Sequence, residues 1–462
     1  MDTKALRQKI LDLAIHGKLV PQDPNDEPAS VLLERIRAEK ERLIKEGKIK
    51  KGKKSAKTSD KPHYPFELPK GWCFTNIGEL LINRDGERKP VSSAIRSKQS
   101  NKIYDYYGAA GVIDKIDDYL FDEKLLLIGE DGANLLSKSK NNAFFAEGKY
   151  WVNNHAHVLD AIDKNLLEYV AIVINAIKLD DYITGSAQPK LSQDNLNKIP
   201  IVLPPLSEQK RIMEAIIHWS LLIEQIEQNK IDLQASIKQA KSKVLDLAIH
   251  GKLVSQDPND EPASELLKRI NSKAEITCDN PQYGKLPFVI PSSWEWVKLS
   301  GIAKSNIGLT YRPTDIVSTG VPVYRSNNIR NGKIDTTDLV KVSTKILEKQ
   351  LLHVGDLLIC ARNGSRNLIG KNAIISELKE PTSFGAFMAV CRSAYNQWIR
   401  IVLNSEYFDR YLDDSNSATI NQVTQKMLLA LPIPLPPHQE QHRIVAKIEE
   451  LFAQLDKIEA SL

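Results

Sequence analysis

The sequence predicts an α+β protein in which two mixed α/β domains are separated by long antiparallel coiled-coil helices, in a pseudo-two-fold, circular arrangement. Three observations predict it: segments that occur twice in the same order, long stretches with heptad spacing, and short strand-like segments between them. The 462 residues, 42% hydrophobic and 26% charged, are enough for two or three domains with real cores.

Three segments of the chain are duplicated. LDLAIHGKLVPQDPNDEPASVLLERI at 11–36 returns at 245–270 with 23 of 26 positions identical. PFELPKGW at 65–72 is similar to PFVIPSSW at 287–294, and IPIVLPPLSEQKRI at 199–212 is similar to LPIPLPPHQEQHRI at 431–444. The stretches between them barely resemble each other. We therefore expect two units that share a frame and differ in content.

The frame after the first Pro-Pro pair is predicted to be a coiled-coil helix, bounded by Pro205 and Gly251. Its apolar residues recur at steps of three and four. They are Ile212, Ile216, Trp219, Ile223, Ile226, Leu233, Ile237, Ala240, Val244 and Leu247. Such a helix spans roughly 54 Å between the first and last of these residues.

The second copy of this helix is split between the two ends of the chain. After the second Pro-Pro pair the register continues through Ile444, Ile448, Leu451, Leu455, Ile458 and Leu462, and the positions of Ala240, Val244 and Leu247 are taken by Leu6, Ile10 and Leu13. We expect residues 1–17 to dock beside 438–462, with the composite antiparallel to 206–250. Ordinary amphipathic surface helices are the alternative, but they do not explain a split repeat.

Five segments follow from this pattern. They are 1–64 (N-terminal helix, repeat and basic linker), 65–204 (first domain), 205–282 (central helix and repeat), 283–436 (second domain) and 437–462 (distal helix). Each domain is predicted to hold a twisted sheet and to end in a helical stretch, at 165–179 and 395–412. GEDGAN at 129–134 and CARNGS at 360–365 are expected to be equivalent loops after equivalent strands.

Charge and cysteine usage bound the function. The net charge is +5, but residues 37–62 hold eleven Lys/Arg and four Asp/Glu, a net of +7, so the rest of the chain carries about −2. DNA binding must therefore rest on local patches. The Lys-rich run at 45–61 favours a solvated linker over a phosphate site. Four dispersed cysteines and the lack of an apolar leader favour the cytoplasm.

The chain resembles the specificity (S) subunit of Type I restriction–modification systems. The features that carry the resemblance are the duplicated LDLAIHGKLV frame, the two P-P-x-x-E-Q-x-R-I helix openings, the PFELPKGW and PFVIPSSW segments, which we call the lead-in segments, and the two unlike domains. The resemblance implies two target recognition domains, each reading one half of a bipartite, asymmetric DNA site, with the helices fixing the spacer. Half-sites read from one face of DNA lie about 34–36 Å apart, or multiples of that, which suits such a rod.

The resemblance also implies partners. These are double-stranded DNA, two modification subunits that methylate adenine, and two motor–nuclease subunits in the restriction complex. The chain itself is expected to be non-catalytic, without metal or cofactor, while S-adenosylmethionine, ATP and Mg act only in the partners. The amphipathic helix expected at 29–43 could seat a modification subunit.

Candidate DNA contacts are Arg, Lys, Asn, Gln and His residues in polar loops, since these side chains read base edges and phosphates. In the first domain they are Arg96, Lys98, Gln99, Lys102, Lys138, Lys140, Asn153, Asn154 and His155. In the second domain they are Arg325, Asn327, Asn328, Arg330, Arg362, Asn363 and Arg366. The acidic pair Glu130–Asp131 would repel phosphate, so contact with a cytosine edge or a structural turn is expected there.

Other readings of the sequence are weaker. A coiled-coil scaffold that binds proteins rather than DNA is the main alternative. Asp356 with Glu377 and Lys379 has the loose spacing of a metal-dependent nuclease, but such triplets arise often by chance. NPQY at 280–283 imitates a methyltransferase loop without the cofactor motif, so a turn is expected. His16 and His250 precede Gly17 and Gly251, and a favourable position at a helix C-terminus accounts for them.

Overall fold

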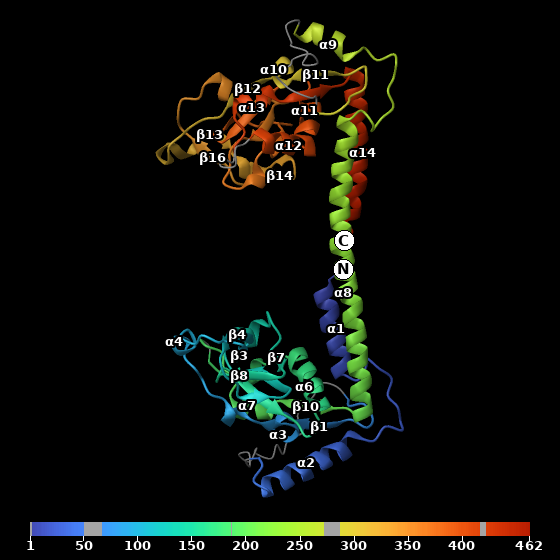
Figure 1. Ribbon diagram of the computed structural model, residues 1–462, viewed down its shortest axis with the longest axis vertical. Helices are drawn as coiled ribbons and strands as arrows, with labels where there is room; N and C mark the ends of the chain where they lie inside the picture. The colour runs from blue at the N-terminus through green and yellow to red at the C-terminus, as the bar shows by residue number, and fades with distance from the viewer. Residues whose placement is uncertain (1, 50–66, 186, 272–286, 416–421) are drawn as a thin grey trace. The chain divides into compact units, whose positions relative to one another are not determined.

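The computed structural model describes residues 2–49, 67–185, 187–271, 287–415 and 422–462. It contains two compact units, Met1–Asn229 and Lys230–Leu462 (Figure 1). Helix α8 (Leu206–Ile249) is one continuous helix of 44 residues that contributes its first part to unit 1 and its second part to unit 2. The predicted unbroken central helix is therefore confirmed. Most of the Lys-rich run and the NPQY segment lie outside the described residues.

Unit 1 combines helices with two sheets and a short two-stranded ribbon. Its helices are α1 (Thr3–Ile15), α2 (Ala29–Lys45), α3 (Ile77–Leu80), α4 (Ser93–Arg96), α5 (Asn134–Ser137), α6 (Asn165–Ala176), α7 (Gln193–Lys198) and the start of α8. Its strands are β1 (Cys73–Asn76), β2 (Ile82–Asn83), β3 (Tyr104–Gly108), β4 (Gly111–Ile116), β5 (Phe121–Asp122), β6 (Leu125–Gly129), β7 (Ala143–Ala146), β8 (Lys149–Val152), β9 (Ala156–Asp160) and β10 (Pro200–Leu203).

Unit 2 has the same kinds of element. Its helices are the end of α8, α9 (Ala263–Ile270), α10 (Leu299–Ile302), α11 (Asn396–Leu403), α12 (Glu406–Ser415), α13 (Gln425–Ala430) and α14 (His438–Ala460). Its strands are β11 (Glu295–Lys298), β12 (Lys304–Ile307), β13 (Ile316–Tyr324), β14 (Ile329–Arg330), β15 (Lys333–Ile334), β16 (Val340–Val342), β17 (Leu357–Cys360), β18 (Asn372–Ile374), β19 (Ser383–Phe384), β20 (Met388–Arg392) and β21 (Pro432–Leu435).

The two domains share one topology despite their unlike sequences. The main sheet has the strand order β2-β9-β6-β7 in unit 1 and β12-β20-β17-β18 in unit 2, with all neighbours antiparallel. A second sheet contains an antiparallel and a parallel pairing in each unit, β4-β3-β8 and β16-β13-β19. The loops after β6 and β17 are therefore equivalent, as predicted.

The centre of each main sheet is made by its most apolar strand. β6 (LLLIG) and β17 (LLIC) are buried along their whole length. A strand covered on both faces reads as a continuous apolar run rather than an alternating one. Helix α6 packs its apolar residues on the first sheet, and α11 packs Trp398 and Ile399 in the core of unit 2.

Each unit pairs part of α8 with a shorter helix. In unit 1, Arg7 near the start of α1 contacts Glu227 at 3.0 Å, while Ile15 at its end lies in the same core as Ile212. α1 therefore runs antiparallel to α8. In unit 2, Lys241 contacts Asp456 near the end of α14 at 2.7 Å, and Leu245 shares a core with Ile444 and Ile448, so α14 is antiparallel as well. That 1–17 meets 438–462 stays a prediction.

The predicted pairing residues differ in burial. Buried are Ile10, Ile212, Ile223, Ile237, Ile444 and Ile448, and half-buried are Leu6, Leu13, Ile216, Val244, Leu247, Leu451 and Leu455. Trp219, Ile226, Leu233 and Ile458 are exposed, against the heptad prediction. Trp219 and Ile226 lie between Ile212 and Glu227, the stretch of α8 that runs beside α1, and are exposed all the same. A single partner helix therefore covers a narrower face of α8 than the heptad pattern predicts.

A buried carboxylate joins the three duplicated segments in each unit. In unit 1 the Glu208 carboxylate accepts hydrogen bonds from Trp72 Nε1 at 2.9 Å and from Gln22 Nε2 at 3.4 Å. One turn further along α8, Arg211 pairs with Asp26 at 2.6 Å. Trp72 ends the lead-in segment, Gln22 and Asp26 belong to the LDLAIHGKLV repeat, and Glu208 opens α8. The motif therefore holds the helix, the repeat and the domain together.

Unit 2 repeats this arrangement atom for atom. Glu440 accepts from Trp294 Nε1 at 2.9 Å and from Gln256 Nε2 at 2.5 Å, and Arg443 pairs with Asp260 at 2.5 Å. The carboxylates are 1% exposed in both units. We call these two sets of contacts the frame junctions. Their identity explains why the flanking segments are nearly the same in both copies.

Glycine is required where each repeat passes the lead-in segment. Gly17 has φ +62° and Gly251 has φ +68°. A Cβ on Gly17 would lie 2.5 Å from Pro69, and one on Gly251 would lie 2.3 Å from Pro291. Positive φ and close approach both exclude larger residues. Just before each glycine, Nδ1 of His16 and of His250 lies 2.6 and 2.7 Å from a helix-terminal carbonyl oxygen, as expected.

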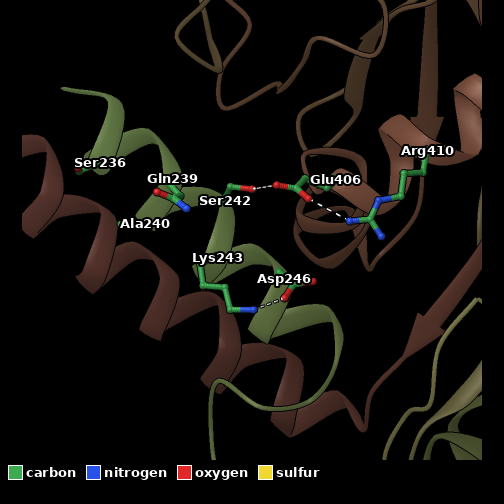
Figure 2. A pocket seen from close by; sticks show the side chains of 8 residues that line it. All are labelled: Ser236, Gln239, Ala240, Ser242, Lys243, Asp246, Glu406 and Arg410. Atoms are coloured by element: carbon green, nitrogen blue, oxygen red, sulfur yellow. Dashed lines mark hydrogen bonds and ion pairs between the residues drawn. The ribbon is translucent and has the colours of Figure 1, made fainter. Parts of the chain in front are cut away.

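The helical stretch predicted over 395–412 is two helices rather than one. α11 ends at Leu403, and Ser405 turns its hydroxyl back to the Val402 carbonyl at 2.7 Å before α12 begins. Figure 2 shows what α12 does: the Ser242 hydroxyl of α8 donates to the Glu406 carboxylate at 2.7 Å. The extra helix thus attaches the domain to the second part of α8, beside a pocket that also contains Arg410.

Helix α2 lies on its own domain. Ala29, Leu32, Leu33 and Ile36 are buried in the core of unit 1. Lys40 donates to three backbone carbonyls at the end of α3, at 2.8 to 3.0 Å, and burial lowers its pKa to about 8. Much of the apolar face of this helix is therefore already covered by its own domain, and its role as a seat for a modification subunit stays a prediction.

Replacing the junction tryptophan should destabilise the protein. Trp72→Phe removes the donor to Glu208 and leaves a buried carboxylate poorly paired, so we expect a loss of about 1–3 kcal/mol in the free energy of unfolding. Denaturant unfolding measures it, and Trp294→Phe is the matched variant in unit 2, with the same expected loss. An unchanged midpoint for both variants would contradict the role of the junctions.

The junction ion pair should make stability depend on pH in a defined direction. The hydrogen bond from Arg211 holds the pKa of the Asp26 carboxyl below its ordinary value. A carboxyl with a lowered folded pKa stabilises the protein above its unfolded pKa, and this contribution is lost as pH falls through the folded pKa. Wild type should therefore exceed Asp26→Asn in stability at pH 7, and the gap should close below about pH 4. A gap that is constant with pH would refute this.

Candidate nucleic-acid interface

The structure brings two predicted DNA-contact clusters of unit 2 together. The turn after β13 carries Arg325 to Arg330, and the loop after β17 carries Arg362 to Arg366. Asn363 Nδ2 of the second loop donates to the Ser326 hydroxyl of the first at 3.3 Å. The two loops therefore form one polar surface at the end of the main sheet, although they are far apart in sequence.

Several guanidinium groups of this surface are paired with carboxylates. Arg325 contacts Asp338 at 3.4 Å, Arg330 contacts Asp335 at 2.9 Å, and Arg366 contacts Asp413 at 2.5 Å. Arg362 instead lies over the Phe387 ring, 5.6 Å from its centroid. Exposed pairs of this kind are weak, so the guanidinium groups can exchange these carboxylates for another anion.

The two asparagines of the first loop have different roles. Asn328 is buried, accepts from the Arg325 backbone N–H at 2.8 Å and donates to the carbonyls of Asp335 and Asp338. Its amide is fully used in holding the turn. Asn327 is exposed, and its amide donates to the Asp338 carboxylate at 2.8 Å. Of the two, Asn327 is the one placed to meet a ligand.

In unit 1 the predicted contacts lie in separate places. Arg96 and Lys102 both bind Asp114 of β4, at 2.8 and 2.6 Å, and these hydrogen bonds hold the pKa of the Asp114 carboxyl well below its usual range. Arg96 also stacks on Tyr106, with 4.2 Å to the ring centroid. This guanidinium is built into the sheet. Lys98 beside it is exposed, and Gln99 is half-buried.

The remaining candidates of unit 1 also include residues that are bound by their own fold and residues that are exposed. Lys138 donates to the Asn175 carbonyl at 3.2 Å and to that of Ile177, so it closes the C-terminus of α6, and burial lowers its pKa. Asn153 is buried and accepts from the His155 N–H at 2.8 Å. Exposed and facing solvent are Lys140, Asn154 and His155.

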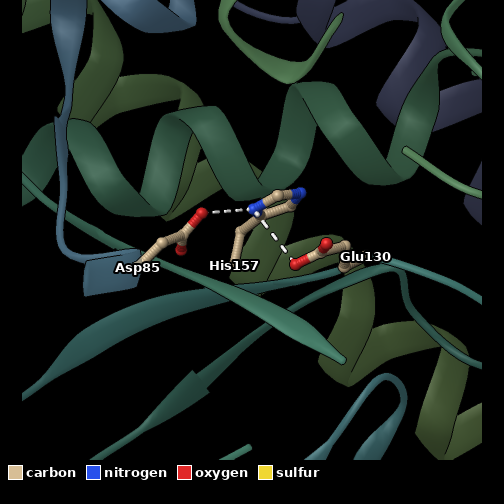
Figure 3. A group of neighbouring side chains, drawn as sticks. All are labelled: Asp85, Glu130 and His157. Carbon is tan, nitrogen blue, oxygen red and sulfur yellow. Dashed lines mark hydrogen bonds and ion pairs between the residues drawn. The ribbon is translucent and has the colours of Figure 1, made fainter. Parts of the chain in front are cut away.

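A charged cluster lies beneath the last of these residues. His157 is 1% exposed, and its Nδ1 lies 2.6 Å from Asp85 Oδ2 and 3.8 Å from Glu130 Oε2 (Figure 3). Its Nε2 lies 2.8 Å from the Leu191 carbonyl oxygen. Burial opposes ionisation of Asp85, but the hydrogen bond from His157 and the charges of His157 and Arg88 hold its pKa below the ordinary value. Both ring nitrogens therefore face oxygen atoms of the same domain.

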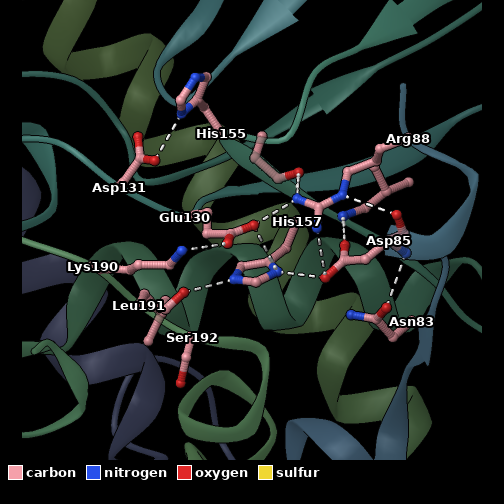
Figure 4. A network of polar contacts seen from close by, with 12 residues as sticks. Asn83, Asp85, Arg88, Glu130, Asp131, His155, His157, Lys190, Leu191 and Ser192 are labelled. Carbon is pink, nitrogen blue, oxygen red and sulfur yellow. Dashed lines mark hydrogen bonds and ion pairs between the residues drawn. The ribbon is translucent and has the colours of Figure 1, made fainter. Parts of the chain in front are cut away.

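The cluster is a structural network rather than a metal centre. Three side chains could offer ligand atoms within 4.8 Å of one another. Figure 4 shows that cations already hold the carboxylates: Arg88 donates to Glu130 at 2.7 Å, and Lys190 lies 3.4 Å from it. Asp85 also accepts the Val158 N–H at 2.8 Å. Of the two readings of Glu130, the structural turn is therefore favoured.

Unit 2 has apolar residues where unit 1 has this cluster. The strand registers pair Ile128 with His157 in unit 1 and Ile359 with Ala389 in unit 2. By the same registers, His157 corresponds to Ala389, and the next residue after each strand, Glu130 in unit 1, corresponds to Ala361. Beside Ala389, the register of β12 places Ile307. The network thus belongs to the variable content of unit 1 and not to the shared frame.

The nuclease triplet does not form a site. Asp356 is 4% exposed, accepts the His353 N–H at 2.9 Å and pairs with Arg392 at 3.1 Å, while Glu377 and Lys379 are exposed. A carboxylate saturated in this way by its own fold is not available as a metal ligand. Within the described part of the chain, every helix is too short or too polar to cross a bilayer.

Comparison with known proteins agrees with this architecture. Residues 69–237 and 291–462 match the family described as the Type I restriction modification DNA specificity domain. The chain is 30% identical to the EcoAI specificity subunit of Escherichia coli over 543 aligned positions, which cover 98% of this chain and 90% of that protein. It is 28% identical to the EcoEI specificity subunit of the same species, over 99% and 90% of the two chains.

Solved structures show the same fold. The HsdS subunit from Thermoanaerobacter tengcongensis matches with a TM-score of 0.50 and 16% identity, over 86% of this chain and 93% of that one. A chain from a study of complex assembly and conformational transition in the Type I restriction–modification system matches with a TM-score of 0.51 and 17% identity, over 86% and 94%.

Two copies of a DNA specificity domain on a shared helical frame define a DNA-recognition protein with two readers. The chain belongs to the family of Type I restriction–modification specificity subunits, the non-catalytic components that recognise DNA in these systems. The family resemblance inferred from the duplicated motifs is confirmed.

Substitution of the two neighbouring asparagines should affect stability to different extents. Asn328→Ala removes a buried amide and leaves the Asp335 and Asp338 carbonyls without this donor, so we expect a loss of about 1–3 kcal/mol in unfolding free energy. Asn327→Ala removes an exposed amide and should change stability by no more than about 0.5 kcal/mol. Thermal or denaturant unfolding compares them. Equal losses would show that the turn is not held by Asn328.

Proposed function

We propose that this chain recognises a bipartite, asymmetric DNA sequence, with one half read by each unit. The observation that carries the proposal is that both units have the same fold and the same frame junctions but unlike residues at the loop surfaces. A shared frame supports two equivalent seats for partner subunits, whereas unlike surfaces support two different half-sites.

The proposed partners are double-stranded DNA, two methyltransferase subunits and two motor–nuclease subunits. The methyl donor, ATP and Mg would then act in those subunits, with the cytoplasm as the compartment. The exposed members of the predicted clusters are the proposed DNA contacts: Lys98, Lys140, Asn154 and His155 in unit 1, and Asn327, Arg330 and Arg362 in unit 2. Arg325, Asn363 and Arg366 are half-buried beside them.

The remaining candidates act less directly in this proposal. Arg96, Lys102, Lys138, Asn153 and Asn328 are held by their own fold, so they would position the surface rather than read a base. Gln99 is half-buried next to the exposed Lys98. Continuity of α8 supports its proposed role as the spacer between the half-sites.

Exchange of one reader should change one half of the recognised sequence. Residues 65–200 would be replaced by the corresponding segment of a relative, in the protein co-expressed with its methyltransferase. Sequencing of methylated adenines should show a split motif in wild type and a new half beside an unchanged half in the hybrid. The same exchange over residues 287–432 is the matched control, with the opposite half altered.

An unchanged motif after both exchanges would refute the proposal. Methylation that persists without any split motif would instead favour a scaffold that assembles partners without reading DNA.

A further inference from the structure

Matching backbone contacts place one pair of side chains at the same point of both domains. In unit 1 the Glu130 N–H donates to the His155 carbonyl at 2.8 Å, and in unit 2 the Ala361 N–H donates to the Phe387 carbonyl at 2.9 Å. The preceding registers pair Gly129 with Ala156 and Cys360 with Met388. His155 and Phe387 are therefore equivalent.

The loop residues that follow are equivalent too. Asp131 forms a bridge with Lys190, and Arg362 forms one with Gln422. The next residue of each bridging segment donates to the loop at the same distance, Leu191 to Glu130 and Val423 to Ala361, both at 2.7 Å. Asp131 in unit 1 thus corresponds to Arg362 in unit 2.

At this shared point, which we call the sheet-end pair, the two side chains touch in both units but differ in chemistry. In unit 1, His155 Nδ1 lies 2.7 Å from Asp131 Oδ2 (Figure 4). In unit 2, the Arg362 guanidinium lies over Phe387, which is 61% exposed. An acidic residue beside a histidine is replaced by a basic residue over an aromatic ring.

The backbone under each sheet-end pair is held by hydrogen bonds of the same domain. The Phe387 carbonyl accepts from both Ala361 and Arg362, at 2.9 and 3.0 Å. In unit 1 the charged cluster supports the pair from below. Glu130, directly before Asp131, is held by an ion pair with Arg88, and His157 lies two residues after His155 in the sequence. Side chains that read bases must be held by such a scaffold. The apolar counterpart in unit 2 needs no such cluster.

We propose that the sheet-end pairs are the residues that decide which base each unit reads. This inference rests on the proposed DNA-recognition function. Arg362 donates to the O6 and N7 acceptors of a guanine, while Phe387 packs on a neighbouring thymine methyl, which explains why a large aromatic side chain stays exposed in the free protein. Asp131 accepts from the amino group of a cytosine, and His155 orients its carboxylate.

Single substitutions in the methyltransferase-bound protein test the assignment. In Arg362→Ala, the preference for G·C at one position of the second half-site should fall about 5- to 150-fold, with the first half-site unchanged. Asp131→Ala should relax one position of the first half-site only. Methylome sequencing and competition binding with single-base variants of the wild-type site measure both effects.

The controls are charged residues of the same units that lie outside the proposed DNA contacts. Arg410→Ala also removes a guanidinium, but one on α12 that pairs with Glu406, and Lys115→Ala removes an ammonium group of β4 that pairs with Asp105. Both should keep the full motif. Thermal unfolding confirms that the Ala variants are folded, and Phe387→Leu, which keeps an apolar group, should retain the guanine preference.

Two outcomes overturn the inference while leaving the proposed function standing. In the first outcome, both Ala variants keep the full base preference of the wild-type motif, although the motif does change when a whole recognition domain is exchanged. The other is a uniform loss of affinity for all sequences with a weaker dependence on salt, which is the behaviour of phosphate contacts. Failure of the reader exchange itself would refute the function instead.

Discussion

The buried carboxylate of the frame junction is the contact on which the rest of the structure depends. Glu208 in unit 1 and Glu440 in unit 2 are nearly inaccessible to solvent, and burial raises the pKa of both carboxyl groups. Burial of a carboxylate is costly unless donors surround it. Here the donors come from two other duplicated segments, an indole and an amide. The hydrogen bonds of the carboxylate therefore form only when the helix, the repeat and the domain are packed together.

This constraint explains the contrast between constant and variable parts of the chain. A junction residue that changes alone destabilises the protein, because the loss of one donor leaves a buried carboxylate poorly paired. Loop residues at the sheet ends do not have to donate to a buried carboxylate. The same backbone position accepts an Asp–His pair in one unit and an Arg–Phe pair in the other, so recognition can diverge while the frame stays fixed.

The candidate surface could be predicted only in part. Polar loops with Arg and Asn in unit 2 were identified from their composition, and the structure joins them through Asn363 and Ser326. Arg96 and Lys138 have the same composition signal, yet the fold uses both for its own stability. Whether a guanidinium or ammonium group is free depends on carboxylates and carbonyls distant in sequence. Phe387 could not be predicted as a surface residue, because a phenylalanine next to an apolar strand is expected from the sequence to lie in the core.

The sequence by itself determined the duplication, the continuous central helix and the family, because these follow from heptad periodicity and from repeated segments that can be aligned directly. It also predicted that the loops after β6 and β17 are equivalent. Only the tertiary structure decided which heptad residues are covered, which charged side chains are already paired, and which two side chains meet at each sheet end. Those outcomes depend on registers between strands and on which face of a helix its partner covers, and neither is encoded in any local stretch of sequence.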